Sequence, residues 1–142
     1  MTIAAILASK GGDVVALTAD MRVSDAVAIL TDKRIGAAPV TDGTSVVGIF
    51  SERDVIHCLH AEGAAALDKR VADVMTAPVQ SVTPKEAVIG ALSLMTRRRI
   101  RHLPVMDGDR IVGFVSIGDL VKYRIERIEA DAEAMRSYIQ SV

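Results

Sequence analysis

Aromatic residues, cysteine and long apolar runs are all scarce in this chain of 142 residues, which has no tryptophan and only two tyrosines and two phenylalanines. The single cysteine, Cys58, excludes a disulfide within the chain and is compatible with a reducing cytosol. The apolar run from Ile3 to Ala8 is short and has no basic segment before it, so it is a poor signal peptide, and no stretch reaches membrane-spanning length. We therefore expect a cytoplasmic location and no membrane partner.

An excess of positive charge is also missing. The formal net charge of −1 at pH 7 gives no general attraction to nucleic acid. The segment RRRIRH at 97–102 is locally basic, but few aromatic side chains are present for base stacking. A cationic helix end, which complements the helix dipole, is the simpler interpretation of Arg97, Arg98 and Arg99. We expect no nucleic-acid partner.

Catalytic and metal-binding constellations do not stand out. The sequence shows no Ser-His-Asp arrangement, glycine-rich phosphate loop or acid pair, so we expect no enzymatic activity. His57 and His60 can share a helical face, but Cys58 points elsewhere and no further ligand group is near in sequence, so we expect no bound metal. The abundant residues are Ala, Val, Ile and Leu, which suit closely packed helices and strands.

An internal repeat organises the chain. Sliding the sequence over itself by 65 residues aligns 17–57 with 82–122 without a gap. The identical pairs span the whole unit and include Thr18 with Thr83, Val23 with Val88, Arg34 with Arg99, Ile35 with Ile100, Pro39 with Pro104, Gly43 with Gly108, Gly48 with Gly113, Ser51 with Ser116 and Asp54 with Asp119. The two halves therefore predict two copies of one structural unit.

Each copy predicts a strand, a helix, two strands and a closing helix. The first strand is expected at 13–17 and again at 79–82, and apolar residues at i, i+3, i+4 and i+7 from Val23 and Val88 indicate the first helix. Thr18 and Thr83 are the expected N-caps of that helix. In the second copy, Thr83 is followed by proline and then by Glu86, a capping-box pattern with proline at the first helical position.

The second half of each unit contains a hairpin and a helix start. Asp42-Gly43 and Asp107-Gly108 are expected as tight turns between the strands 37–41 and 45–50, and between 103–106 and 110–115. A Ser-x-x-Asp step at 51–54 and again at 116–119 predicts a capping box in which the acid lies at the positive end of the closing helix.

One such unit leaves a face of its sheet exposed, whereas two units packed with pseudo-twofold symmetry bury both faces. We therefore predict an α/β (α+β) fold of two β-α-β-β-α repeats and a long C-terminal helix. The expected organisation is repeat 1 at 1–61, a linker at 62–70, repeat 2 at 71–123 and an amphipathic helix at 124–142.

The tail carries an apolar heptad seam formed by Val121, Ile125, Ile128, Ala132, Met135, Ile139 and Val142. In a parallel pair of such helices, Arg124 would face Glu129 and Asp131 would face Arg136. Because three heptads are marginal alone, two interpretations stay open. The helix forms a two-stranded coiled coil, or it lies back on its own domain or on that of a partner.

Five motifs occur in an order that repeats: VADVMT, IGAAPVTDG, IRHLPVMDG, VVGIFSERDV and IVGFVSIGDL. With these motifs the chain resembles a tandem pair of CBS domains from about residue 3 to about residue 123. The CBS domain is the cystathionine β-synthase type module, and a pair of them is also called a Bateman module. The resemblance implies a regulatory module that binds adenosine-containing ligands in clefts between its two units and commonly pairs into a flat dimeric disc.

The resemblance also implies site residues. Asp54 and Asp119 are the implied ribose ligands, in addition to their capping role. The expected phosphate or cleft residues are Ser51, Arg53, Arg101, His102 and Ser116, and strand alternation predicts that only one of Arg101 and His102 faces the cleft. The expected base pocket comprises Thr18, Ile35, Gly36, Ala37, Ala38, Pro39, Thr83, Ile100, Leu103 and Pro104.

We thus expect a stand-alone, homodimeric sensor of AMP, ADP or ATP with an unknown downstream protein and no obligate cofactor. S-adenosylmethionine is a less favoured ligand because the basic strand favours phosphate. The alternative is a dimerisation or partner-docking scaffold whose clefts bind no ligand.

Overall fold

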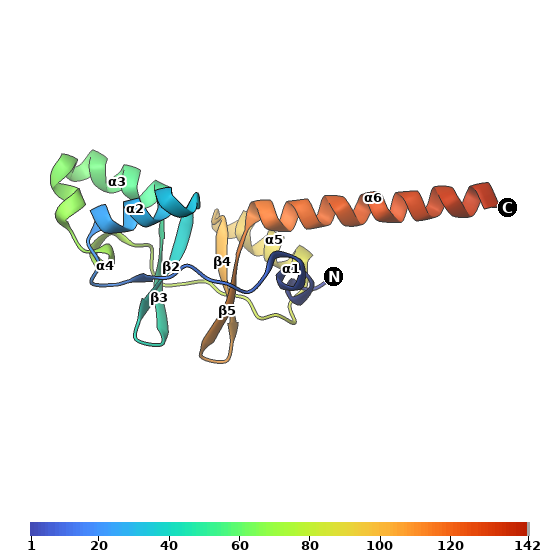
Figure 1. The fold of residues 1–142 in the computed structure, drawn as a ribbon, viewed down its shortest axis with the longest axis horizontal. Coiled ribbons are helices and arrows are strands. Elements are labelled where there is room, and N and C mark those ends of the chain that lie inside the picture. Colours follow the sequence, from blue (N-terminus) through green and yellow to red (C-terminus); the bar gives the residue numbers. More distant parts are fainter. Residues whose placement is uncertain (142) are drawn as a thin grey trace.

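The computed structural model describes residues 1–141. Two β-hairpins stand side by side with their turns pointing the same way, helices cover the opposite ends of the strands, and one long helix projects beyond them (Figure 1). The elements are α1 (Ile3–Lys10), β1 (Leu17–Thr18), α2 (Val23–Lys33), β2 (Ala37–Asp42), β3 (Ser45–Ser51), α3 (Glu52–Glu62), the 3₁₀ helix η1 (Gly63–Asp68), α4 (Val71–Val74), α5 (Val88–Arg98), β4 (His102–Asp107), β5 (Arg110–Ser116) and α6 (Ile117–Ser141).

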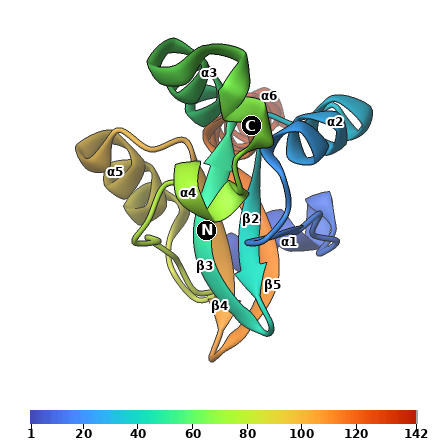
Figure 2. The same cartoon turned by 90° about the vertical axis from the view of Figure 1, so that its left-hand side faces the viewer.

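The two hairpins repeat one register. Strand β2 pairs antiparallel with β3, and β4 pairs with β5 in the same way, each with an irregularity at the equivalent step after Val40 and after Val105. In the view along the long axis, α2 and α5 lie on opposite sides of the stacked hairpins while α3 and α6 lie together at one end (Figure 2). The predicted pair of similar units is confirmed.

The first strand of each unit is shorter than predicted. Strand β1 contains only Leu17 and Thr18, which pair in parallel with β2. In the second unit, Val82 alone forms a parallel bridge, to Val105. The hairpin turns are also displaced by one residue, because Asp42 still pairs with Ser45 and leaves Gly43 and Thr44 as the loop.

The predicted starts of α2 and α5 are wrong. Helix α2 begins at Val23 and α5 at Val88, so Thr18 and Thr83 are not their N-caps. The first N–H groups find backbone acceptors from other segments: Val23 donates to the carbonyl of Lys69 at 2.9 Å, and Val88 to that of Met1 at 3.2 Å. The Thr83 pattern instead forms a turn before the helix, in which the backbone N–H of Glu86 donates to the Thr83 carbonyl. Backbone carbonyls from distant segments thus take the place of the threonine side chains as acceptors for the first N–H groups of these helices.

Each unit has its own apolar core, and each core takes a segment from outside its repeat. Ile3 and Ile6 of α1 are buried in the core of the second unit. Ala66 and Val71, which follow the first repeat in sequence, are buried in the core of the first. Helix α1, which precedes the first repeat, therefore completes the core of the second unit. The segment 66–71, which precedes the second repeat, completes the core of the first.

Helix α6 continues from the closing helix of the second unit into the tail without a break. Its 25 residues correspond to a length of about 37 Å. Most of this length projects beyond the rest of the molecule (Figure 1). The interpretation in which the tail lies back on its own domain is therefore wrong for residues 127–141, which are exposed, and the last heptad residue, Val142, lies outside the described residues.

Candidate functional site

Both Ser-x-x-Asp corners form the predicted capping box. At the first corner, the Ser51 hydroxyl accepts from the Asp54 N–H at 3.3 Å, and Asp54 Oδ2 accepts from the Ser51 N–H at 2.9 Å. The corresponding distances for Ser116 and Asp119 are 3.1 and 2.8 Å. Each acid therefore lies in the first turn of a helix, where the positive end of the dipole favours its charge.

The second carboxylate oxygen of Asp54 faces the segment that leads into the second unit. Asp54 Oδ1 accepts from the Thr76 hydroxyl at 2.9 Å. Thr76 is held there by two backbone hydrogen bonds with Ile49 of β3, at 2.8 and 3.0 Å. Sequence reasoning missed Thr76 as a site residue, although the VADVMT motif ends on it.

A cavity of about 560 Å³ opens beside Asp54. Its walls come from both units and from the segment between them, and it has the size of a small-molecule site. The lining residues are Gly36, Ile49, Ser51, Glu52, Arg53, Asp54, Ile56, Thr76, Pro78, Val79, Gln80, Arg98, Arg99, Ile100, Arg101 and His102. We call this the Asp54 cleft.

The Asp54 cleft combines a carboxylate with a strongly cationic wall. Four arginines line it: Arg53 at the start of α3, Arg98 and Arg99 at the end of α5, and Arg101 just before β4. Glu52 and Asp54 are the carboxylates of the same wall. Arginine side chains bind phosphate through paired charge-assisted hydrogen bonds, so this wall suits an anionic ligand.

The prediction that strand alternation separates Arg101 from His102 is wrong, because both residues line the Asp54 cleft. Strand β4 begins only at His102, so Arg101 precedes the strand and alternation does not apply to it. The His102 ring stacks on Phe114 with centroids 5.6 Å apart and planes inclined by 9°. Burial, and secondarily the Lys10 ammonium, lowers the pKa of His102, which leaves the imidazole neutral near pH 7 and Arg101 as the stronger phosphate donor.

The residues predicted for the base pocket fall into three groups. Gly36 and Ile100 line the Asp54 cleft, and Ile35 lines an adjacent cavity. Thr18 and Thr83 are exposed. The remaining five are buried within β2 and β4, namely Ala37, Ala38, Pro39, Leu103 and Pro104. Pro39 lies in the middle strand of its sheet.

The second corner has a different partner. The Lys10 ammonium lies 2.5 Å from Asp119 Oδ2 and donates to the Phe114 carbonyl at 2.7 Å. Burial raises the pKa of Asp119, but the hydrogen bonds from Lys10 and Ser116 outweigh it and leave the pKa below its usual value. The cavity that includes Asp119 measures about 200 Å³, which is small for a nucleotide.

Lys10 was missed by sequence reasoning because it belongs to α1, which precedes the gapless part of the repeat. Only the tertiary structure brings α1 against the second corner. The structure therefore joins most of the predicted cleft residues around Asp54 and places an ion pair at Asp119.

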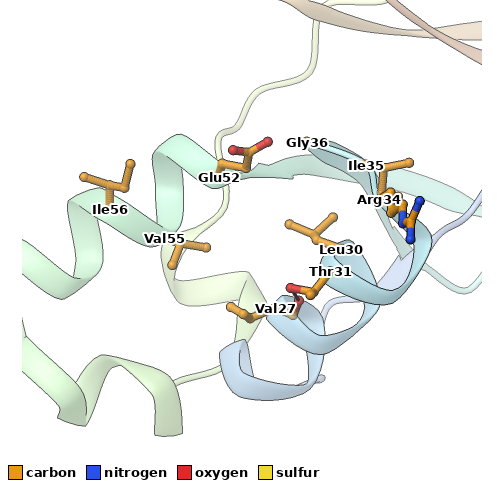
Figure 3. Close-up of a pocket in the computed structure, with 9 residues that line it drawn as sticks. All are labelled: Val27, Leu30, Thr31, Arg34, Ile35, Gly36, Glu52, Val55 and Ile56. Atoms are coloured by element: carbon orange, nitrogen blue, oxygen red, sulfur yellow. Dashed lines mark hydrogen bonds between the residues drawn. The ribbon is translucent and has the colours of Figure 1, made fainter.

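A further cavity, of about 470 Å³, lies between α2 and α3 (Figure 3). Val27, Leu30 and Val55 give it an apolar floor, with Arg34 and Glu52 at its polar rim. It shares Gly36, Glu52 and Ile56 with the Asp54 cleft, so the two hollows adjoin.

The described residues include no cluster of three His, Cys, Asp or Glu side chains suited to a metal ion. Cys58 is buried, and its thiol donates to the Val55 carbonyl at 3.2 Å. None of the helices in residues 1–141 is both long and apolar enough to cross a membrane.

A CBS domain family model matches residues 5–61 and again residues 71–126. This chain belongs to the CBS domain family. The mitochondrial CBS domain-containing protein CBSX3 of Arabidopsis thaliana is 34% identical to it over 148 residues, covering 98% of this chain and 72% of that protein. The CBS-domain-containing protein ATU1752 of Agrobacterium tumefaciens superposes with a TM-score of 0.85 at 37% identity, covering 87% of this chain and 99% of that chain.

The CBS domain pair of protein MJ0100, in complex with 5′-methylthioadenosine and S-adenosyl-L-methionine, superposes with a TM-score of 0.79 at 22% identity. It covers 89% of this chain and 98% of that one, and the likeness shows a shared fold. The pair of CBS domains predicted from the motifs is thus confirmed.

Proposed function

We propose that this CBS pair is a regulatory module that binds one adenine nucleotide, AMP, ADP or ATP, in the Asp54 cleft. One observation supports the proposal above all: a helix-capping carboxylate and four arginines line the same cavity of about 560 Å³. The adenosyl ligands in the related MJ0100 pair support the adenosine half of the ligand.

The chemistry of the cleft matches the two ends of a nucleotide. Asp54 Oδ1 accepts a hydrogen bond from the neutral hydroxyl of Thr76. A ribose hydroxyl is a donor of the same kind and would take its place when the nucleotide binds. The phosphates would meet Arg53 and the first N–H groups of α3, together with Arg101 from the opposite wall. S-adenosylmethionine carries a sulfonium cation in place of phosphate, so the arginines disfavour it.

The Asp119 corner is the weaker candidate for a nucleotide. A ligand there must displace the Lys10 ammonium, and the adjoining cavity is only about 200 Å³. We therefore propose one nucleotide per chain, bound through Asp54.

Thermal denaturation of the full chain with AMP, ADP, ATP and S-adenosylmethionine tests the proposal. A nucleotide present at about a hundred times its Kd adds about 2.7 kcal/mol of stability, which raises Tm by several degrees. If no adenine nucleotide raises Tm at millimolar concentration, the sensor proposal fails. A larger shift with S-adenosylmethionine than with AMP would contradict the phosphate preference.

Asp54→Asn and Asp119→Asn form a matched pair, because each removes one capping carboxylate without changing side-chain size. Loss of a charge-assisted hydrogen bond should weaken nucleotide binding roughly tenfold to a hundredfold in Asp54→Asn, as measured by calorimetric titration. Asp119→Asn should leave the affinity unchanged. Equal effects of the two substitutions would contradict the assignment to the Asp54 cleft.

A scaffold that docks a partner without a ligand is the second candidate. The exposed apolar residues of α6 favour it, since Ile125, Met135 and Ile139 are 50%, 60% and 65% exposed. The homodimer, the downstream protein and the cytoplasmic location stay predictions.

A further inference from the structure

Helix α6 carries an exposed apolar stripe that begins at Val121 and continues into its projecting part. Val121, Ile125, Ile128, Met135 and Ile139 are 42%, 50%, 53%, 60% and 65% exposed. They recur at alternating spacings of four and three residues, so with Ala132 they lie along one face of a continuous helix. We call this face the α6 seam.

Little in the chain itself stabilises this projecting helix. Its ion pairs are Arg127 with Asp131 at 3.8 Å and Arg136 with Glu133 at 3.2 Å, and all four side chains are more than half exposed. Such pairs add only a few tenths of a kcal/mol each. A helix of this length in water depends mainly on burial of its apolar face, which requires a second surface.

The charges beside the α6 seam indicate which surface fits. With Ile125, Ala132 and Ile139 at a positions, Arg124 and Asp131 occupy g positions, and Glu129 and Arg136 occupy e positions. A parallel, in-register copy of the same helix brings Arg124 opposite Glu129 and Asp131 opposite Arg136 on both sides of the seam. Opposite charges meet at each of these contacts.

The body of the molecule is compatible with the same symmetry. In Figure 1, α3 and α6 run along the same long side of the molecule. Ile56 on α3 is the repeat counterpart of Val121 and is 67% exposed. A twofold axis parallel to α6 on that side brings α3 toward its own copy, whereas an antiparallel pair of tails places the two bodies at opposite ends and leaves Ile56 uncovered.

We infer that the α6 seam is covered by the α6 seam of a second copy of this chain, in a parallel two-stranded coiled coil. The two CBS pairs then lie at the same end of the coiled coil. The seam beyond Glu126 lies apart from the proposed nucleotide site, because it takes no part in the described cavities. Ile56 differs, since it also lines the Asp54 cleft.

Light scattering and sedimentation equilibrium of the full chain test the association. We expect twice the chain mass, and a monomer at all concentrations would overturn the inference. Ile128→Asp places a charge in the seam and should raise the dimer dissociation constant at least tenfold. Its matched control is Ala130→Asp, which introduces the same charge on the opposite, exposed face of α6 and should leave the dissociation constant unchanged.

A dimer that tolerates Ile128→Asp as well as Ala130→Asp would place the interface elsewhere and overturn the inference. Because residues 128 and 130 are both exposed in the single chain, neither substitution should disturb folding. The circular dichroism and Tm of the CBS pair provide that control.

Two further variants test the parallel orientation. Arg124→Glu puts like charges opposite each other and should weaken the dimer, and adding Glu129→Arg should restore it. Met135→Cys should cross-link the two chains rapidly on mild oxidation, because equal positions face each other in a parallel pair. The unmodified chain is the control, since its only thiol, Cys58, is buried. If the Met135→Cys variant forms a dimer but no cross-link on oxidation, its helices are antiparallel or out of register, and the inferred parallel orientation is overturned.

Discussion

At the scale of single residues, the two equivalent carboxylates differ in what faces them. Asp54 meets the hydroxyl of Thr76 at 2.9 Å, whereas Asp119 meets the ammonium of Lys10 at 2.5 Å. Both partners come from segments outside the gapless repeat. A hydroxyl exchanges readily with a ribose hydroxyl, but an ion pair has to be broken first. The asymmetry therefore lies in the partners and not in the repeated residues.

Removal of this ion pair should open the second corner. Lys10→Ala removes both the charge and the length of the side chain, so the cavity beside Asp119 widens and its carboxylate becomes free to accept hydrogen bonds. Calorimetric titration with AMP should then give two nucleotides per chain in place of one. Lys122→Ala is the control, because Lys122 lines the same cavity without a hydrogen bond to Asp119. An unchanged stoichiometry in Lys10→Ala would show that Lys10 does not block the corner.

His102 should make stability depend on pH below neutrality. Its pKa is lowered in the folded chain, mainly by burial, so the unfolded chain binds more protons between the folded pKa and the ordinary value of 6.5. The contribution is present above pH 6.5 and is lost as the pH falls toward the folded pKa. His102→Phe keeps the stack on Phe114 and removes the titration. Urea denaturation from pH 7.5 to 5 should show a smaller fall in unfolding free energy for the variant, and identical pH profiles would contradict this role.

At the scale of elements, local signals succeeded where the partners are local. The Ser-x-x-Asp corners form as predicted because donor and acceptor are three residues apart. The hairpins form because Gly43 and Gly108 supply the positive φ, +64° and +62°, that their turns require. The starts of α2 and α5 could not be predicted, since their acceptors are the carbonyls of Lys69 and Met1, far along the chain.

The crossing of the 75–76 segment over β3 depends on a glycine. A Cβ on Gly48 would clash with the sulfur of Met75 and would lie 3.0 Å from the Thr76 carbonyl. Gly48→Ala should therefore destabilise the chain by about 1–3 kcal/mol and weaken AMP binding, because Thr76 and Asp54 share this region. Urea denaturation and calorimetry are the measurements.

Gly90→Ala is the matched control for Gly48→Ala. Gly90 lies inside α5, and a Cβ there meets no atom within 4 Å among the described residues. The same chemical change should raise the unfolding free energy by about 0.5–1 kcal/mol, since alanine is the better helix former. Equal effects of the two substitutions would contradict the close approach at Gly48.

At the scale of the whole molecule, the two cores are linked by exchanged segments. Ile3 and Ile6 complete the second core, and Ala66 and Val71 complete the first. The backbone follows the same exchange, since Ile3 donates to the Glu86 carbonyl at 2.9 Å and Val71 to that of Met21 at 2.7 Å. A cut of the chain between its two repeats would therefore expose apolar surface in both halves.

Ile3→Ala tests this exchange. Ile3 is fully buried, so the substitution should lower the unfolding free energy by about 2–5 kcal/mol. Hydrogen exchange should rise first in α5, β4 and β5, although the first of these elements begins 85 residues after Ile3 in the sequence. Increased exchange in α2, β2 and β3 instead would contradict the assignment of α1 to the second core.

The sequence by itself determined the family, the two-unit α/β fold, the hairpins and the capped corners at Asp54 and Asp119, because a gapless repeat and short-range capping patterns need no knowledge of distant contacts. Only the tertiary structure decided which helix covers which core, where α2 and α5 begin, that Thr76 and Lys10 face the two carboxylates, and that the end of α6 projects beyond both units. The first three depend on contacts between residues that are far apart in the sequence, and the last depends on the absence of such contacts, so no local pattern could predict them.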